Sequence, residues 1–373
     1  MIIAGEASGD LHGALLIKEL KKINPSLQIY GIGGARMISE GMNAQYNIKQ
    51  MAFLGFIEVI KHLPFITKVK SDLLKTIEEE NIDTVVLIDY PGFNLNIAKR
   101  LKELGKKIIY YISPQVWAWG KHRIDKIREV VDEMIVVFPF EEKLYIKNSV
   151  PVNYAGHPII EHIDNYSYLL KDEFYKKFAL DPAKEILLIL PGSRKHEIKK
   201  LFVKCLTAAT KLANEFNLQI VVACSENIDE DIFSQLSSSN NFKIIKGYTY
   251  DLFKHSYFGI IKSGTSTLEA GIFELPFLVV YSTNTITYLL GRILVQIKNI
   301  SIANIILEEN VVDELIQFDV NPENIYNKGS NILKDKYRYN AIKQKLSLIR
   351  KKLGGTGASA KAASIVNKIL NEA

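Results

Sequence analysis

A chain of 373 residues is longer than a single hydrophobic core usually supports, so two domains are expected. An apolar fraction of 47% and a charged fraction of 24% are typical of a globular protein and exclude a disordered one. The two cysteines, Cys205 and Cys224, have no metal-binding or redox spacing and exclude a disulfide framework. A net charge of +6 favours anionic partners, but no RNA-binding signature is present, so nucleic acid is not an expected partner.

The beginning of the chain, MIIAGEASGD, lacks the basic and apolar regions of a signal peptide. No apolar run approaches the roughly 18 residues that a membrane span needs. We therefore expect a cytoplasmic protein, or one that binds a membrane peripherally.

Short runs rich in Val, Ile and Leu alternate with amphipathic stretches, which predicts parallel sheets covered by helices. Strands are predicted at residues 1–4, 28–31, 84–88, 107–112, 134–137, 152–154, 186–190, 219–224, 242–245, 258–261 and 277–280. The pattern predicts an α/β protein with two doubly wound, Rossmann-like domains facing a central cleft. Residues 1–160 form the first domain, residues 161–340 the second, and residues 341–373 a helical tail that crosses back to the first. The polar stretch 161–184 is the expected linker.

A glycine-containing turn, Gly5 to Asp10, directly follows the first predicted strand and opens a helix. Gly5 and Gly9 allow a ligand to approach the backbone, and the helix N-terminus suits an anion. The spacing does not match the dinucleotide-binding GxGxxG pattern, and a plain turn is the alternative.

Asp89 ends an apolar strand and places a carboxylate at the edge of the sheet where ligands bind. A strand-end Asp can also cap the following helix, although Pro91 and the residues after it lie between them. The next strand is followed by Ser113 to Trp119, which holds both tryptophans of the chain beside Gln115. Aromatic rings next to amide groups are frequent in carbohydrate-binding surfaces, and packing between domains is the alternative.

Two small-residue turns in the second half have the chemistry of a diphosphate site. Gly192, Ser193 and Arg194 follow a strand and combine backbone N–H donors with a guanidinium. Residues 263–269, SGTSTLE, offer hydroxyls at a second helix start, and Glu269 can face a ribose. A capping box is the alternative for this glutamate.

His157 lies in a Gly-His-Pro sequence at the end of the sixth predicted strand and is either a ligand contact or part of a hinge. Residues 229–231 have an Asp-x-Asp spacing, but their polar surroundings indicate a solvated helix start. No other spacing suggests a metal, so neither a metal nor another cofactor is expected.

Taken together, the motifs GEASGD, IDYPGFN, YYISPQVWAW, FPFE, GHP, LPGSR, SGTSTLE and NII…ELIQ resemble, in this order, those of the lipid-A-disaccharide synthase family. The likeness covers nearly the whole chain. It implies a GT-B fold and metal-independent, inverting transfer of 2,3-diacylglucosamine from its UDP derivative to 2,3-diacylglucosamine 1-phosphate (lipid X). The products would be a β-1,6-linked lipid A disaccharide 1-phosphate and UDP. Gly92 stands where many members have Asp, so no role is assigned to it.

The resemblance also implies the site residues. Asp89 is the candidate general base, with Glu6 and Asp10 as alternatives. The candidates for binding substrate are Gly5, Ser8, Gly9, Asn94, Gln115, Trp117, Arg123 and His157. The candidates for binding UDP are Gly192, Ser193, Arg194, Ser263, Gly264, Thr265, Thr267, Glu269 and Asn304.

Both implied substrates carry acyl chains, so the expected partners include the cytoplasmic face of the inner membrane, bound peripherally by a monomer or a homodimer. Residues 51–69 and 288–300 are apolar with scattered basic residues and are candidates for this contact. Packing in the core is the alternative for both stretches.

Three other functions remain compatible with the residues. A UDP-sugar 2-epimerase has the same twin-domain fold but no use for an apolar acceptor face. A non-enzymatic nucleotide-sugar-binding protein would bind UDP without consuming acylated sugar. A related transferase would act on a polyprenyl-linked acceptor.

Overall fold

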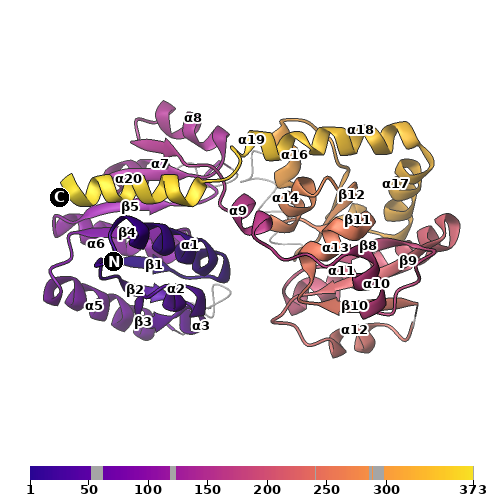
Figure 1. Cartoon of the computed structure of the whole chain (residues 1–373), viewed down its shortest axis with the longest axis horizontal. Helices are drawn as coiled ribbons and strands as arrows, with labels where there is room; N and C mark the ends of the chain where they lie inside the picture. The colour runs from indigo at the N-terminus through magenta and orange to yellow at the C-terminus, as the bar shows by residue number, and fades with distance from the viewer. Residues whose placement is uncertain (52–61, 118–122, 240, 285–287, 289–297, 373) are drawn as a thin grey trace. The chain divides into compact units, whose positions relative to one another are not determined.

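The computed structural model describes residues 1–51, 62–117, 123–239, 241–284, 288 and 298–372 (Figure 1). The chain divides into two compact units. Unit 1 comprises Met1–His162 and Leu353–Ala373, and unit 2 comprises Ile163–Lys352. The C-terminal segment therefore returns to the first unit, as the sequence predicts.

Unit 1 contains a parallel sheet with the strand order β3-β2-β1-β4-β5-β6-β7. Its strands are β1 (Ile2–Ala4), β2 (Tyr30–Gly33), β3 (Asn43–Asn47), β4 (Thr84–Ile88), β5 (Lys107–Tyr111), β6 (Glu133–Val136) and β7 (Val152–Tyr154). Its helices are α1 (Ala7–Ile23), α2 (Ala35–Ser39), α3 (Ile48–Met51), α5 (Leu63–Glu79), α6 (Pro91–Glu103), α7 (Arg123–Val130), α8 (Pro139–Lys147), α9 (Ile159–Asp164), whose end enters unit 2, and α20 (Ala358–Glu372). Figure 1 shows α20 alongside α1, against which it packs.

Unit 2 contains a second parallel sheet with the order β10-β9-β8-β11-β12-β13. Its strands are β8 (Glu185–Leu190), β9 (Leu218–Cys224), β10 (Phe242–Lys246), β11 (Ser256–Lys262), β12 (Phe277–Tyr281) and β13 (Glu314–Ile316). Its helices are α10 (Lys171–Lys177), α11 (Lys195–Phe216), α12 (Asp231–Leu236), α13 (Thr249–His255), α14 (Thr265–Ile272), α16 (Ile302–Leu307), η1 (Gln317–Asp319), α17 (Pro322–Lys334), α18 (Lys336–Leu346) and α19 (Leu348–Lys352). The two sheets confirm the predicted pair of doubly wound α/β units.

The central strands are apolar along their whole length because helices cover both faces of each sheet. All five residues of β4 are buried, and so are the middle four of β8. In unit 1 the core continues into α5 through Val69, Leu73 and Ile77. A sheet covered in this way leaves the loops at the strand ends as the accessible part of the unit.

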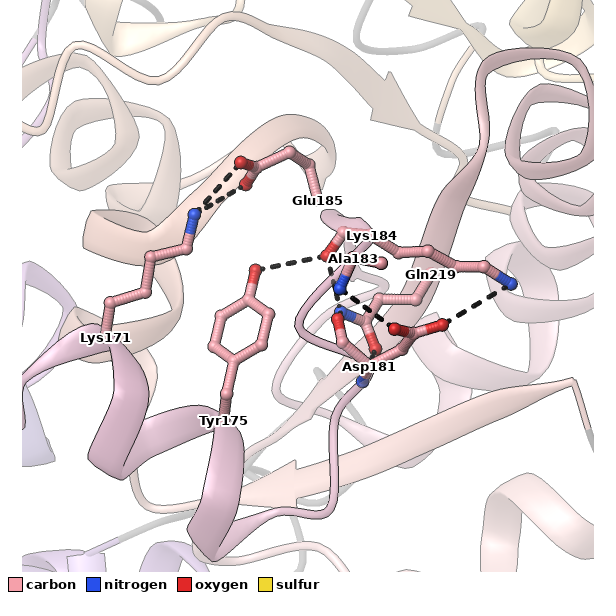
Figure 2. A network of polar contacts seen from close by, with 7 residues as sticks. All are labelled: Lys171, Tyr175, Asp181, Ala183, Lys184, Glu185 and Gln219. Carbon is pink, nitrogen blue, oxygen red and sulfur yellow. Dashed lines mark hydrogen bonds and ion pairs between the residues drawn. The ribbon is translucent and has the colours of Figure 1, made fainter.

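The predicted linker, residues 161–184, is mostly part of unit 2, and Figure 2 shows how its end is attached. Lys171 of α10 forms an ion pair with Glu185 of β8 at 3.0 Å. The side-chain amide of Gln219 accepts from the Asp181 N–H at 2.9 Å and donates to the Lys184 carbonyl at 2.7 Å. These contacts hold the incoming chain against β8 and β9.

Helices α18 and α19 belong to unit 2, whereas the sequence assigns residues 341–352 to the tail. The physical reason is a close apolar contact. A Cβ atom on Gly271 of α14 would lie 2.4 Å from Ile349 and 3.5 Å from Ala303 of α16. Ile349 therefore packs into a space that only glycine leaves open, and the tail of unit 1 begins at Leu353.

Two strands escaped the sequence prediction, β3 and β13. Both lie at sheet edges, and β3 has the polar sequence NAQYN with no apolar alternation. An edge strand is covered on fewer sides, so it needs less apolar character. Much of the two candidate membrane-contact stretches lies outside the described residues: 52–61 of the first stretch and 289–297 of the second. Residues 285–287, just before the second stretch, also lie outside.

Gly31 supports a stability prediction, because it has a φ of +138° and a Cβ at this position would lie 2.0 Å from the Ile2 carbonyl oxygen. We expect Gly31→Ala to reduce the free energy of unfolding of unit 1 by about 3 kcal/mol or more. The measurement is thermal unfolding followed by tryptophan fluorescence, since Trp117 and Trp119 both belong to unit 1.

Gly92→Ala is the matched control, because a Cβ on Gly92 would meet nothing within 4 Å and the residue lies in α6. This variant is expected to be as stable as the parent or slightly more stable. Equal melting of the Gly31→Ala and Gly92→Ala proteins would contradict the prediction.

Candidate active site

In unit 1 the strand order reverses at β1, which lies between β2 and β4. The turn after β1 is the predicted GEASGD segment. A Cβ on Gly5 would lie 2.3 Å from the Tyr90 ring, and one on Gly9 would lie 3.1 Å from Ala4. Packing therefore requires glycine at position 5 and leaves little room at position 9, while Glu6 and Ser8 are exposed at the start of α1.

Asp89 follows β4 on the neighbouring strand, in the left-handed conformation with a φ of 45°. Its N–H donates to the Tyr111 carbonyl at 3.2 Å, and its carbonyl accepts from the Asn94 amide at 2.7 Å. The Tyr110 hydroxyl also donates to the Asp89 carbonyl. Asn94 is fully buried and donates to Ile88 as well, so this candidate binding residue shapes the turn that presents Asp89.

The Asp89 carboxyl has an unusual electrostatic environment. Loss of hydration and, to a smaller extent, the nearby negative charge of Glu6 together raise its pKa to about 6, against the opposing effect of the Tyr90 N–H. A carboxyl with this pKa is ionised at neutral pH but still binds protons readily, as a general base must.

Asp10 is placed differently from the other two carboxylates. One oxygen accepts from the N–H groups of Gly34 at 2.7 Å and Met37 at 3.1 Å, and the other accepts from Arg36 at 3.3 Å. The carboxylate is buried and holds the start of α2. These three donors occupy both of its oxygens.

A row of rings connects Trp117 with the beginning of the chain. Trp117 packs edge-on against Phe140 at 5.3 Å between ring centroids, and Phe140 stacks on Phe138 at 5.4 Å. Phe138 contacts His157 at 5.1 Å, and His157 contacts His12 of α1 at 5.9 Å. The structure therefore brings two predicted candidates, Trp117 and His157, into one continuous aromatic cluster.

His157 and His12 are both buried, and burial lowers the pKa of each, to about 4 for His12. Both are therefore neutral at pH 7. His157 Nδ1 accepts from the Ile159 N–H at 3.2 Å, which fixes its ring. Of the remaining candidates in this unit, Gln115 is exposed and Arg123 is half-buried at the start of α7.

Glu141 is a residue next to this cluster to which the sequence analysis assigned no role. Its carboxyl accepts from the Phe138 N–H at 3.2 Å, and burial raises its pKa to about 8. An acidic residue directly after the apolar run Met134–Phe140 is the signal that could have identified it.

In unit 2 the strand order reverses at β8, which lies between β9 and β11. Ser193 and Arg194 are exposed in the turn after β8, and Gly192 has a φ of +128°. Glu197 lies beneath this turn, where its carboxylate accepts from the Ser193 N–H at 3.2 Å and pairs with Lys262 at 2.7 Å. Glu197 thus fixes the turn from below through the Ser193 N–H, and the exposed Arg194 guanidinium remains for a ligand.

The turn after β11 is held from the inside by two of its predicted ligand hydroxyls. Ser263 donates to the Ile300 carbonyl at 2.8 Å, and Thr267 donates to the Gly264 carbonyl at 2.8 Å. Thr267 also accepts from the Ile302 N–H at 3.1 Å. Thr265 is exposed, so its hydroxyl is accessible to a phosphate.

Glu269 and Asn304 differ in how many of their polar atoms already have hydrogen-bond partners. Burial raises the pKa of Glu269 to about 7, and the Tyr250 hydroxyl donates to it at 3.3 Å. Asn304 is fully buried, with its amide nitrogen donating to Val312 and Glu314 and its oxygen accepting from Val311 and Val312. Asn304 thus organises the chain before β13 and has no vacant polar atom for UDP.

Among the described residues, no three His, Cys, Asp or Glu side chains are grouped so that they could hold a metal ion. The Asp-x-Asp segment lies at the start of α12, where Asp229 accepts from the Asp231 N–H at 3.2 Å. Over the same part of the chain, no helix combines the length and apolar character that crossing a bilayer requires.

Comparison with known proteins identifies the family of this chain. The model of the lipid-A-disaccharide synthetase family matches residues 1–369. The chain belongs to the lipid-A-disaccharide synthase family. The lipid-A-disaccharide synthase of Nitrosococcus oceani is 39% identical, over 95% of this chain and 92% of that protein. The one from Geobacter metallireducens is 37% identical, over 100% and 97%.

Solved structures at low identity show the fold. The UDP-GlcNAc 2-epimerase of Neisseria meningitidis, bound to UDP-GlcNAc, has a TM-score of 0.68 at 16% identity and covers 100% of this chain and 99% of its own. The glycotransferase of kitacinnamycin has a TM-score of 0.66 at 13% identity, with 98% and 97% covered. The predicted GT-B fold is confirmed, and the family separates this chain from the epimerases that share it.

The burial of Asp89 leads to a prediction about stability. A raised pKa means that the Asp89 carboxyl binds a proton more tightly in the folded protein than in the unfolded chain. Stability therefore falls as the pH rises from about 4 to about 6, by up to about 3 kcal/mol. We expect Asp89→Asn to unfold at a higher temperature than the parent at pH 7.5 but not at pH 4, since Asn also tolerates the left-handed conformation.

Asp83→Asn is the control, because the Asp83 side chain is 69% exposed and its surface ion pair with Lys106 contributes little. Its melting temperature should follow that of the parent at both pH values. An Asp89→Asn protein that is no more stable than the parent at pH 7.5 would contradict the assigned burial cost.

Proposed function

We propose that this chain transfers 2,3-diacylglucosamine from UDP-2,3-diacylglucosamine to lipid X, forming the β-1,6-linked lipid A disaccharide 1-phosphate and UDP. Family membership over residues 1–369 supports the reaction. The observation that carries the mechanism is Asp89, a half-buried residue whose carboxyl has a pKa raised to about 6 at the reversal point of a parallel sheet.

In this mechanism Asp89 takes the proton from the 6-hydroxyl of lipid X. The oxygen forms a bond to the anomeric carbon from the side opposite to UDP, and the bond from that carbon to the diphosphate breaks. UDP leaves with the electron pair, so the configuration inverts. A positioned base of this kind contributes about 10²–10⁴-fold to the rate.

The contacts rank the three candidate bases. Asp10 has both oxygens engaged by backbone N–H groups, so removing a proton from a substrate would compete with its hold on α2. Glu6 is exposed and raises the pKa of Asp89 through its charge. We therefore propose Asp89 as the base and Glu6 as the residue that tunes it.

We propose that unit 2 binds UDP. Arg194 and the Gly192 N–H face the diphosphate, with Thr265 on the neighbouring turn, while the Ser193 N–H donates to Glu197 and fixes the turn. Fixed donors of this kind stabilise the charge that develops on a leaving group. We propose Glu269, which is half-buried and one helical turn into α14, as the contact to the ribose.

We propose that the acceptor binds in unit 1, beside the GEASGD turn and the aromatic cluster that includes Trp117 and His157. Stacking on such rings suits a sugar ring, whose C–H faces are apolar. The exposed Gln115 and the half-buried Arg123 offer polar groups to the sugar hydroxyls and the 1-phosphate.

The decisive experiment is mass detection of the disaccharide after incubation of the purified protein with both acylated substrates. Asp89→Asn is expected to lower kcat by about 10²–10⁴-fold with UDP affinity unchanged. The rate of the parent should fall as the pH drops below about 6, where Asp89 takes up its proton.

Glu6→Gln is the comparison variant, and it should shift the acid limb of the pH profile to lower pH, because a negative neighbour has been removed. Turnover near the parent level in Asp89→Asn would remove this residue from the role. Conversion of UDP-GlcNAc to its manno epimer, with no disaccharide formed, would support the UDP-sugar 2-epimerase alternative.

We also propose that the protein, as a monomer or homodimer, binds peripherally to the cytoplasmic face of the inner membrane, where its acylated substrates reside. Co-sedimentation with vesicles containing anionic lipid is expected to decrease on Phe53→Ser with Phe56→Ser, and to decrease in high salt. Ile146→Ser is the control, since Ile146 is an apolar side chain of unit 1 that is 64% exposed outside the candidate stretches. Vesicle binding that changes neither on the two Phe substitutions nor in high salt would contradict this proposed membrane contact.

A further inference from the structure

Lys262 occupies a position between the two small-residue turns of unit 2. It is the last residue of β11, directly before Ser263 and Gly264. Its Nζ lies 2.7 Å from Glu197 Oε1 and 3.8 Å from the place that a Cβ on Gly264 would take. The ammonium group therefore lies within van der Waals distance of this turn.

Glu197 connects the same ammonium group with the other turn. Its second oxygen accepts from the Ser193 N–H at 3.2 Å, and a Cβ on Gly192 would lie 2.5 Å from this oxygen. One carboxylate therefore binds the turn after β8 with one oxygen and Lys262 with the other. The result is a cation held at a fixed place between the two turns.

The surroundings of the pair indicate more than a structural role. The Glu197 side chain is 9% exposed and that of Lys262 22%, so both charges lose much of their hydration. An ion pair in this position gains little net stability, because desolvation offsets the attraction. Among the described residues, the Lys262 ammonium contacts the Glu197 carboxylate and lies 5.9 Å from the centre of the Tyr281 ring, which leaves N–H groups for a further anion.

We propose that Lys262 is a further diphosphate-binding residue and that Glu197 is the residue that positions it. This inference rests on the proposed binding of UDP to unit 2. A lysine ammonium is a compact charge on a flexible stem, so Lys262 can keep its contact with Glu197 and turn its free N–H groups toward a phosphate oxygen. Together with Arg194 it places cations at both turns, where the charge of the departing UDP develops.

The test is calorimetric titration of the full-length protein with UDP and, separately, with uridine, which lacks the phosphates. Lys262→Met keeps the length of the side chain and removes its charge. It is expected to weaken UDP binding by about 10- to 100-fold, the usual effect of losing a hydrogen bond to a charged group, and to leave uridine binding unchanged. Lys262→Arg should restore most of the UDP affinity.

Glu197→Gln distinguishes ligand binding from structural support. If the pair only supports the fold, Lys262→Met and Glu197→Gln should weaken UDP and uridine binding alike and lower the melting temperature together, and this result would overturn the inference. If Lys262 binds phosphate, Glu197→Gln keeps the cation and should lose less UDP affinity than Lys262→Met. The double variant should then match Lys262→Met.

Two further variants separate this inference from the proposed function. Lys328→Met is the matched control, since Lys328 pairs with Asp313 at 3.0 Å in the same unit, and UDP affinity should not change. Arg194→Ala should weaken UDP binding. Loss of affinity in Arg194→Ala but not in Lys262→Met overturns the role of Lys262 alone. Unchanged affinity in both variants overturns the diphosphate site itself.

Discussion

Each sheet reverses its strand order beside its first strand, and the candidate site of each unit depends on this reversal. The helices that follow the two neighbouring strands cross to opposite faces of the sheet, so the loops separate and leave room for a ligand. In unit 1 the reversal brings the GEASGD turn beside Asp89. In unit 2 it brings the Gly192–Arg194 turn beside Ser263–Thr267, with the Glu197–Lys262 pair connecting them.

Within this arrangement the partners of each carboxylate decide its chemistry. Asp10 has three N–H donors and is committed to the backbone. Asp89 is half-buried beside the negative Glu6, and its pKa rises to about 6. Glu197 pairs with Lys262 and holds a cation. The same type of group thus serves as a helix cap, as a candidate base and as a positioning residue.

The sequence predicted the fold class and most strands, because buried parallel strands need continuous apolar runs that are visible without an alignment. It missed β3 and β13 at the sheet edges, where that requirement is relaxed. It predicted Asn94 and Asn304 as ligand contacts, and only the structure shows that their amides also bond to the backbone of Asp89 and of Val311 and Val312. The sequence alone does not distinguish a polar residue that faces a ligand from one that supports the loop.

The sequence by itself determined the two α/β units, the order of the strand-end motifs and the family. These properties are encoded locally, in apolar periodicity and in the spacing of a few glycines and polar residues. The tertiary structure alone decided which charges meet, as with Glu197 and Lys262 or Asp10 and the start of α2. The reason is physical: burial and hydrogen-bond partners set the pKa and the freedom of each side chain, and these partners come from distant parts of the chain.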